Sequence, residues 1–152
     1  TAAEALWSSW HRSSSNEVGD RMRLGFAYME KKHYEQAVQA FTEVTELDPT
    51  FVGGWNQRAM AQLSLRRFEL AIVDCAKALE LKPLHFGSLA TLGMCHKGRG
   101  DSRSAVRYFN ECLEVHPGLL SLKNVVSHLE SQIMRTEISK HLWPRVVHAV
   151  QG

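Results

Sequence analysis

The stretch FVGGWNQRAMAQLSLRRFELAIVDCAKALELKP, residues 51–83, is the middle copy of a unit that also occurs before and after it. Ala71 lies midway between Ala37 and Ala105 in the sequence, and three prolines follow the same spacing. A fixed period of this length indicates a repeat architecture, in which each unit buries its apolar face by stacking on a neighbour. The middle unit is therefore expected to contact both of the others and to form the centre of the fold.

Each unit is expected to contain two amphipathic helices, because its apolar residues recur at helical spacing. In the middle unit Trp55 and Leu63 mark the first helix, and Phe68 marks the start of the second. A proline ends each unit, since proline disfavours helical geometry in the residue before it. Small residues recur where the two antiparallel helices would cross, and a larger side chain there would hold the backbones apart. These residues are Gly25, Ala59, Gly93, Ala37, Ala71 and Ala105.

The segments outside the units are predicted to be helical as well. Residues 2–11 suggest a short helix, followed by a polar break at residues 12–16 whose Asn16 would cap the next helix. Leu119 to Thr136 is expected to form a helix that covers the last unit, and Pro144 is expected to kink or end any helix in the remaining tail. The predicted boundaries are 1–16 for the N-terminal helix and linker, 17–119 for the units (18–51, 52–85 and 86–119) and 120–152 for the capping helix and tail.

Composition restricts the class of protein. The 152 residues fit one domain, and the formal charge of +2 argues against a dedicated nucleic-acid surface. No apolar run approaches the roughly 20 residues of a membrane span. The chain starts at Thr1 without a methionine, so we expect an excised or processed fragment whose targeting segment, if any, lies upstream. Three cysteines without a CxxC spacing suit an intracellular, reducing compartment, which would be the cytoplasm or an organelle matrix or stroma.

The repeated pattern resembles that of the tetratricopeptide repeat family, which shows W-x2-L-G-x2-Y, A-x3-F and P at one fixed period. The first unit shows Leu24-Gly25-x2-Tyr28 and Ala37-x3-Phe41, with arginine in place of the tryptophan. The second unit departs most, with Arg58, Gln62 and Cys75 at family positions. The third has His96 at the tyrosine position. The resemblance implies an all-α fold, a right-handed α-solenoid of three antiparallel helix pairs, with an extra N-terminal helix and a C-terminal capping helix.

The same resemblance implies a binding function. Proteins similar to this one hold a partner peptide or helix in a concave groove lined by the first helix of each unit. Methionine side chains adapt to varied shapes, which suits an apolar or amphipathic ligand. Asn56, Gln57 and Lys97 would make polar contacts that fix the alignment of the ligand in the groove. The implied groove residues are Met22, Phe26, Met29, Asn56, Gln57, Met60, Leu63, Met94 and Lys97.

Some members of the family grip the terminal carboxylate of chaperones with a clamp of lysine, asparagine and arginine. None of the five matching side chains in this sequence is charged, so chaperone-tail docking by that mechanism is not expected. The matching positions are Met22, Phe26, Gln57, Gly87 and Thr91.

Self-association is the second hypothesis, because apolar residues gather near both ends of the chain. Leu6, Trp7 and Trp10 would bury a large apolar area if they docked. They could cap the first unit, occupy the groove of their own chain or exchange with a second chain. Leu142 and Trp143 are too apolar for a free tail and could make oligomer contacts.

RNA binding is a weaker hypothesis, based on an arginine stripe in the last unit. Arg103 and Arg107 are one helical turn apart, and Arg99 and the pair Arg66–Arg67 extend the stripe. A solvated surface is the simpler explanation, because the net charge is small.

Neither a metal site nor a catalytic site is predicted. Cys95 adjoins His96, and Cys112 lies one turn from His116, but four convergent ligands are not evident and the cysteines fall at core positions. The sequence contains no glycine-rich phosphate loop, GxSxG or HExxH motif. We therefore predict a non-enzymatic scaffold or adaptor without a cofactor, whose partner is another protein.

Overall fold

The computed structural model describes the backbone of residues 2–151 and the side chains of residues 2, 16–143 and 145–150. The fold over residues 2–151 is all-α, without strands. Its helices are α1 (Ala2–Glu30), α2 (Tyr34–Leu47), α3 (Val52–Ser64), α4 (Phe68–Leu81), α5 (Phe86–Gly98), α6 (Ser102–Val115) and α7 (Leu120–Gln151). Within the described chain, none of these helices combines the length and apolar character needed to cross a membrane.

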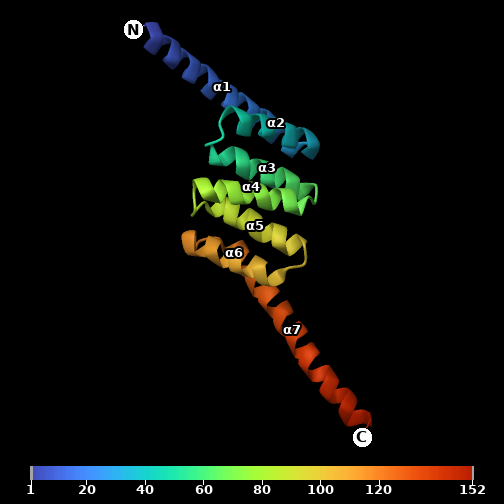
Figure 1. The fold of residues 1–152 in the computed structure, drawn as a ribbon. Coiled ribbons are helices and arrows are strands. Elements are labelled where there is room, and N and C mark those ends of the chain that lie inside the picture. The colour runs from blue at the N-terminus through green and yellow to red at the C-terminus, as the bar shows by residue number, and fades with distance from the viewer. Residues whose placement is uncertain (1, 152) are drawn as a thin grey trace.

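The first six helices form three antiparallel pairs, which stack in chain order (Figure 1). Each pair also packs on the next through α2–α3 and α4–α5, and α7 packs on α6. The start of α1 and the end of α7 extend away from the stack at opposite ends (Figure 1). The predicted solenoid of helix pairs is confirmed.

Small residues lie where paired helices cross, as predicted. Ala37, Ala71 and Ala105 are fully buried. A Cβ added to Gly93 would lie 2.4 Å from the ring of Phe109, which is itself fully buried. The same close approach recurs in the first pair. Only a small residue at these positions lets the aromatic ring of the second helix lie against the backbone of the first.

The turn inside each pair repeats the same backbone geometry. Lys32, Arg66 and Gly100 have positive φ angles of 59°, 58° and 81°, and they are spaced by the repeat period. Lysine and arginine adopt this left-handed geometry less readily than glycine. The packing of the two helices therefore determines the turn in the first two units. Gly98, two residues before Gly100, lies at the end of α5 against the ring of Phe68.

The prediction of a break between two helices near the N-terminus is wrong. Helix α1 is continuous from Ala2 to Glu30, so residues 12–16 lie within it and Asn16 caps no helix. The segment RSSSN contains neither proline nor glycine. Serine and asparagine each lower helix propensity by only roughly 0.5 kcal/mol, which is too little to interrupt a helix that is continued on both sides.

The C-terminal helix is longer than the sequence indicated. Helix α7 continues past Thr136 and does not end at Pro144. Proline inside a helix removes one backbone hydrogen bond, and long helices commonly bend at such a residue rather than stop. The residues expected to form a separate tail are therefore part of α7.

Candidate functional site

Three apolar side chains occupy the same position on the first helix of each pair. Phe26 lies on α1, Met60 on α3 and Met94 on α5, at equal intervals along the sequence. They are 43%, 38% and 40% exposed. We call these three residues the apolar row. Apolar side chains that stay exposed at a repeated position of the first helices are the candidates for contact with a partner.

The other apolar residues predicted for the groove also support the core. Met22 and Met29 are half-buried against the buried cluster between α1, α2 and α3, and Leu63 packs on the cluster between α3, α4 and α5. Phe26 is anchored to the core by an edge-to-face contact with Phe41, whose ring centroid is 5.7 Å away. The apolar row is therefore the most accessible apolar part of the predicted site.

Asn56 connects α3 to α5 and is 6% exposed. Its Oδ1 lies within polar contact distance of two hydroxyls of α5, 3.2 Å from Ser88 Oγ and 3.4 Å from Thr91 Oγ1. Ser88 in turn lies 2.7 Å from His85 Nδ1, which also accepts from the Ser88 backbone N–H and so caps α5. This network fixes the spacing of α3 and α5 beside Met60, whose sulfur is 4.0 Å from Asn56 Nδ2. Sequence reasoning found Asn56 but missed Ser88 and His85.

The remaining polar residues of the predicted site differ in exposure. Gln57 is half-buried and Lys97 is exposed. Gly87 and Thr91, the last two of the five clamp positions, are joined to each other, because Thr91 is buried and donates to the carbonyl oxygen of Gly87 at 2.9 Å.

Arg58, which departs from the family pattern, is part of a buried ion pair. Its Nη2 and Nε lie 2.6 Å and 2.9 Å from the two carboxylate oxygens of Asp74. Its Nη1 also donates to the hydroxyls of Thr42 and Thr45, both at 3.3 Å, and the guanidinium lies over the ring of Trp55. One side chain thus connects α2, α3 and α4. The sequence carried one sign of this pair, a carboxylate inside the apolar run of α4.

Two of the three thiols, Cys75 and Cys112, are poor candidates for chemistry, whereas the hydrogen bond with Cys75 lowers the pKa of Cys95. Cys75, Cys95 and Cys112 are free and buried. The hydrogen bond with Cys95, together with burial, raises the pKa of Cys75, and burial raises the pKa of Cys112, whose Sγ donates to the Phe86 carbonyl. A thiol must ionise to act as a nucleophile or metal ligand. Among the described residues, no cluster of three or more histidine, cysteine, aspartate or glutamate side chains could hold a metal ion.

The arginines of the predicted stripe make contacts within the chain. Arg107 lies over the ring of Tyr108, and Arg66 over that of Phe68. Three ion pairs connect successive units along the stack, one from each helix pair to the element that follows it. In the first two the acid lies on the earlier element and the base on the later one, and in the third this order is reversed. The pairs are Glu35–Arg67, Glu69–Arg99 and Arg103–Glu137. Glu35, Glu69 and Arg103 occupy the same position of successive units, so this charge reversal is visible in the sequence.

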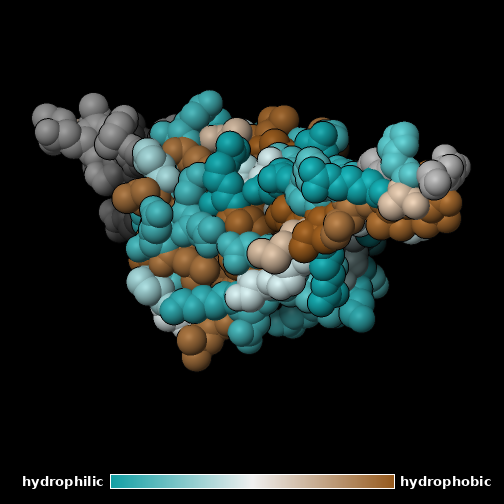
Figure 2. Space-filling model, turned by 90° about the horizontal axis from the view of Figure 1, so that it is seen from below, coloured by the Kyte–Doolittle hydropathy of each residue, from teal (hydrophilic) through white to brown (hydrophobic). Residues whose placement is uncertain are grey.

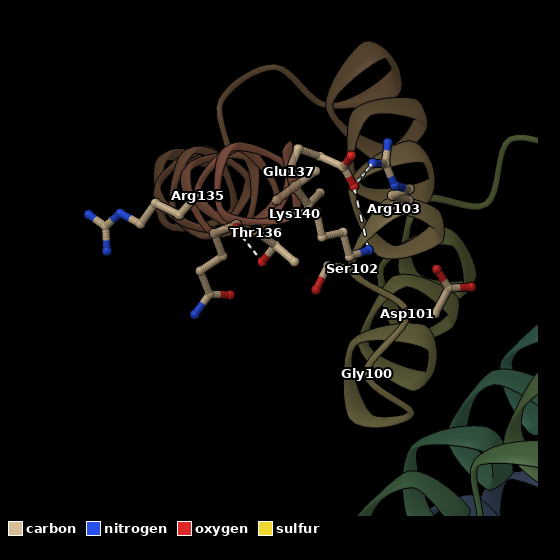
Figure 3. A pocket seen from close by; sticks show the side chains of 10 residues that line it. Gly100, Asp101, Ser102, Arg103, Arg135, Thr136, Glu137 and Lys140 are labelled. Atoms are coloured by element: carbon tan, nitrogen blue, oxygen red, sulfur yellow. Dashed lines mark hydrogen bonds and ion pairs between the residues drawn. The ribbon is translucent and has the colours of Figure 1, made fainter. Parts of the chain in front are cut away.

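A polar cleft of about 570 Å³ lies between the start of α6 and the middle of α7 (Figure 3). Glu137 is one of its lining residues, 2.7 Å from Arg103 Nη2 and 3.9 Å from Lys140 Nζ. The hydrogen bond from Arg103 lowers the pKa of this carboxyl. The Arg103–Glu137 pair joins α6 to α7, so this contact helps to hold α7 on the stack. The lining residues are Gly100, Asp101, Ser102, Arg103, Gln132, Ile133, Arg135, Thr136, Glu137 and Lys140.

Of the two terminal groups predicted for docking or self-association, the structure describes the side chains of the C-terminal one. The side chains of Leu6, Trp7 and Trp10 lie outside the described residues. Leu142 and Trp143 lie on α7 and are 52% and 69% exposed.

Comparison with known protein families identifies the repeats. Residues 21–51 match a sequence pattern described as tetratricopeptide repeat, and residues 52–83 and 86–118 match a second pattern with the same description. Together these segments cover more than half of the chain. The predicted resemblance is confirmed on all three units.

Similar proteins are much longer than this chain. Sperm-associated antigen 1 of Mus musculus is 32% identical over 104 residues, which are 68% of this chain and 11% of that protein. The Hsp70-Hsp90 organizing protein of Triticum aestivum is 30% identical over 99 residues, 65% of this chain and 17% of that protein. The chain therefore spans less than a fifth of these relatives.

A solved structure shares the fold. The first TPR of Spaghetti (RPAP3), bound to the HSP90 peptide SRMEEVD, matches with a TM-score of 0.75 and 20% identity. The match covers 79% of this chain and 95% of that one.

Proposed function

Because this chain belongs to the tetratricopeptide repeat family, we propose that it is a non-enzymatic adaptor that binds an apolar peptide or amphipathic helix on the apolar row. The partner's apolar side chains cover Phe26, Met60 and Met94, and the exposed Lys97 and half-buried Gln57 contribute polar contacts at the edge. Met22, Met29 and Leu63 support the row from the core and contribute their accessible atoms.

The observation that carries this proposal is the similar exposure of the three residues of the apolar row, between 38% and 43%. Each residue follows a crossing position that is buried and small in its own unit (Gly25, Ala59, Gly93), so the same backbone geometry presents all three. Two of the three are methionines, whose flexible thioether side chains adapt to ligands of different shape. An amphipathic helix or an extended apolar segment provides the complementary surface.

The chemistry of the row also argues for an apolar ligand over an acidic tail. The RPAP3 domain was solved with an acidic peptide, SRMEEVD. In this chain the five clamp positions carry no cation, and Thr91 and Asn56 are engaged with each other beneath the surface. A buried carboxylate without a cationic partner would be unfavourable there.

The proposal is tested by selecting ligands from a random peptide display library and measuring their affinity by fluorescence anisotropy. We expect the selected peptides to carry apolar residues at helical or alternating spacing. We also expect Met60→Glu to weaken their binding by on the order of tenfold or more, since it places a charge in the centre of an apolar contact. The peptide SRMEEVD should bind neither the wild type nor the variant.

Leu24→Glu is the matched control, because Leu24 is also 38% exposed and mid-helix but lies on the opposite side of α1 from Phe26. It should retain binding, and both variants should keep the helicity of the wild type. Unchanged affinity of a folded Met60→Glu variant would show that the apolar row is not the binding surface. Tight binding of SRMEEVD would contradict the assignment of ligand class.

The two other hypotheses receive less support. Arg67, Arg99 and Arg103 are ion-paired to carboxylates, which leaves fewer free cations for RNA phosphates. Self-association through Leu142 and Trp143 would use the exposed part of α7. The buried free thiols favour a reducing compartment.

A further inference from the structure

Helix α7 changes character about halfway along its length. Its first half packs on α6, with Val126 and Leu129 buried in the cluster that contains Phe109. From Met134 onward every apolar side chain described is exposed, and the ribbon leaves the stack (Figure 1). From Ile138 to Val150 the exposed fractions range from 38% for Val147 to 82% for Val150. The second half of α7 is therefore an apolar helix face without support from the described chain.

The exposed residues divide into two faces. At 3.6 residues per turn, the large apolar side chains of this segment fall within an arc of about 180°. Lys140, His141, Arg145 and His148 fall in the opposite arc. Figure 2 shows the projecting end of the molecule with hydrophobic side chains along one edge and hydrophilic ones along the other. The apolar face consists of Ile138, Leu142, Trp143, Val146, Val147 and Val150.

The charges of this segment identify the kind of surface that would cover it. Residues 138–150 contain Lys140 and Arg145 and no aspartate or glutamate, and the acid that precedes them, Glu137, lies 3.9 Å from Lys140 Nζ but is engaged more closely by Arg103 at 2.7 Å. In a second copy of the chain the same cations would flank the paired apolar faces with no acid opposite them, and like charges in that position repel. In an anionic bilayer, the acyl chains complement the apolar arc of the helix and the lipid phosphates complement the cationic arc. Trp143 lies within the apolar arc, and an indole ring suits the lipid–water interface.

We propose that residues 138–150 of α7 bind the surface of a bilayer that contains anionic phospholipid. The apolar arc enters the boundary between acyl chains and headgroups, and Lys140 and Arg145 lie against the phosphates. The segment lies on the bilayer, because its cationic arc stays in water. The apolar row is on other helices, so peptide binding and lipid binding use separate surfaces.

The test is co-sedimentation of the full chain with phosphatidylcholine vesicles, with and without phosphatidylserine, at low and physiological salt. We expect binding to the mixed vesicles that weakens with salt, and little binding to phosphatidylcholine alone. Leu142→Glu should reduce binding on the order of tenfold or more. The double variant Lys140→Gln/Arg145→Gln should weaken binding and remove most of its salt dependence. Leu70→Glu on α4 is the matched control, since Leu70 and Leu142 are both 52% exposed, and it should bind like the wild type.

Three results would overturn the proposal. The first is equal binding to both kinds of vesicle, because the cations would then have no role. The second is unchanged vesicle binding by Leu142→Glu in a chain of normal helicity. The third is no vesicle binding together with a dimer in sedimentation velocity that Leu142→Glu dissociates, which would assign this face to a second copy of the chain.

Discussion

The Arg58–Asp74 pair should make the middle unit sensitive to the loss of one charge. The carboxylate of Asp74 is 4% exposed, whereas the guanidinium side of the pair is 19% exposed. Arg58→Met leaves Asp74 buried without its cation and removes the donor shared by Thr42 and Thr45. Breaking a buried pair from one side costs about 3–5 kcal/mol, because the remaining charge is uncompensated.

The assay is urea unfolding followed by far-ultraviolet circular dichroism. A loss of this size is comparable to the total stability of a small domain, about 5–15 kcal/mol, so the midpoint should fall steeply. The double variant Arg58→Met/Asp74→Leu should be more stable than Arg58→Met alone, since it buries no unpaired charge. This recovery separates the electrostatic effect from lost packing over Trp55.

Arg67→Met is the control, because the Arg67–Glu35 pair is 42% and 59% exposed. Its loss should change the free energy of unfolding by about 1 kcal/mol or less. If Arg58→Met cost no more than Arg67→Met, Asp74 would not be the buried partner described above. If the double variant were destabilised by the sum of the losses measured for Arg58→Met and for Asp74→Leu alone, the two side chains would not be coupled.

Two further predictions concern the stability of single positions. Gly93→Ala should destabilise the chain by about 1–3 kcal/mol in urea unfolding, because its Cβ would lie 2.4 Å from the buried ring of Phe109. Gly19→Ala should instead stabilise α1 by up to about 1 kcal/mol, because the atom nearest to the added Cβ, on Arg23, would be 3.8 Å away. If Gly93→Ala stabilised the chain, the crossing geometry described above would be refuted. Burial and nearby Lys82 lower the pKa of His85 below its ordinary value of 6.5, so the folded chain disfavours protonation of this imidazole. The stability that His85 contributes is therefore present above pH 6.5 and is lost as the pH falls below that value. His85→Asn keeps a side chain that can cap α5 but does not titrate in this range. Its free energy of unfolding should therefore fall less than that of the wild type between neutral and mildly acidic pH. An equal fall in the two proteins would contradict the role of His85.

Sequence reasoning succeeded where several positions of the repeat carry the same signal. Gly25 and Gly93 against Phe41 and Phe109 are two copies of one helix crossing, and the structure shows both. It failed where the outcome depends on the sum of many small terms. The RSSSN segment lowers helix propensity without any single residue that stops a helix, so the break predicted there did not form.

The site shows the same division between repeated and single features. Phe26, Met60 and Met94 share one position, so the backbone that presents one of them presents all three. Asn56 has no counterpart of its kind in the other units, where Met22 and Ala90 occupy its position. Whether its amide faces a ligand or a neighbouring helix depends on Ser88 and Thr91, which lie 32 and 35 residues further along the chain. The repeat period predicts where a side chain is placed, but the contact that a non-repeated polar residue makes depends on its neighbour in the next unit.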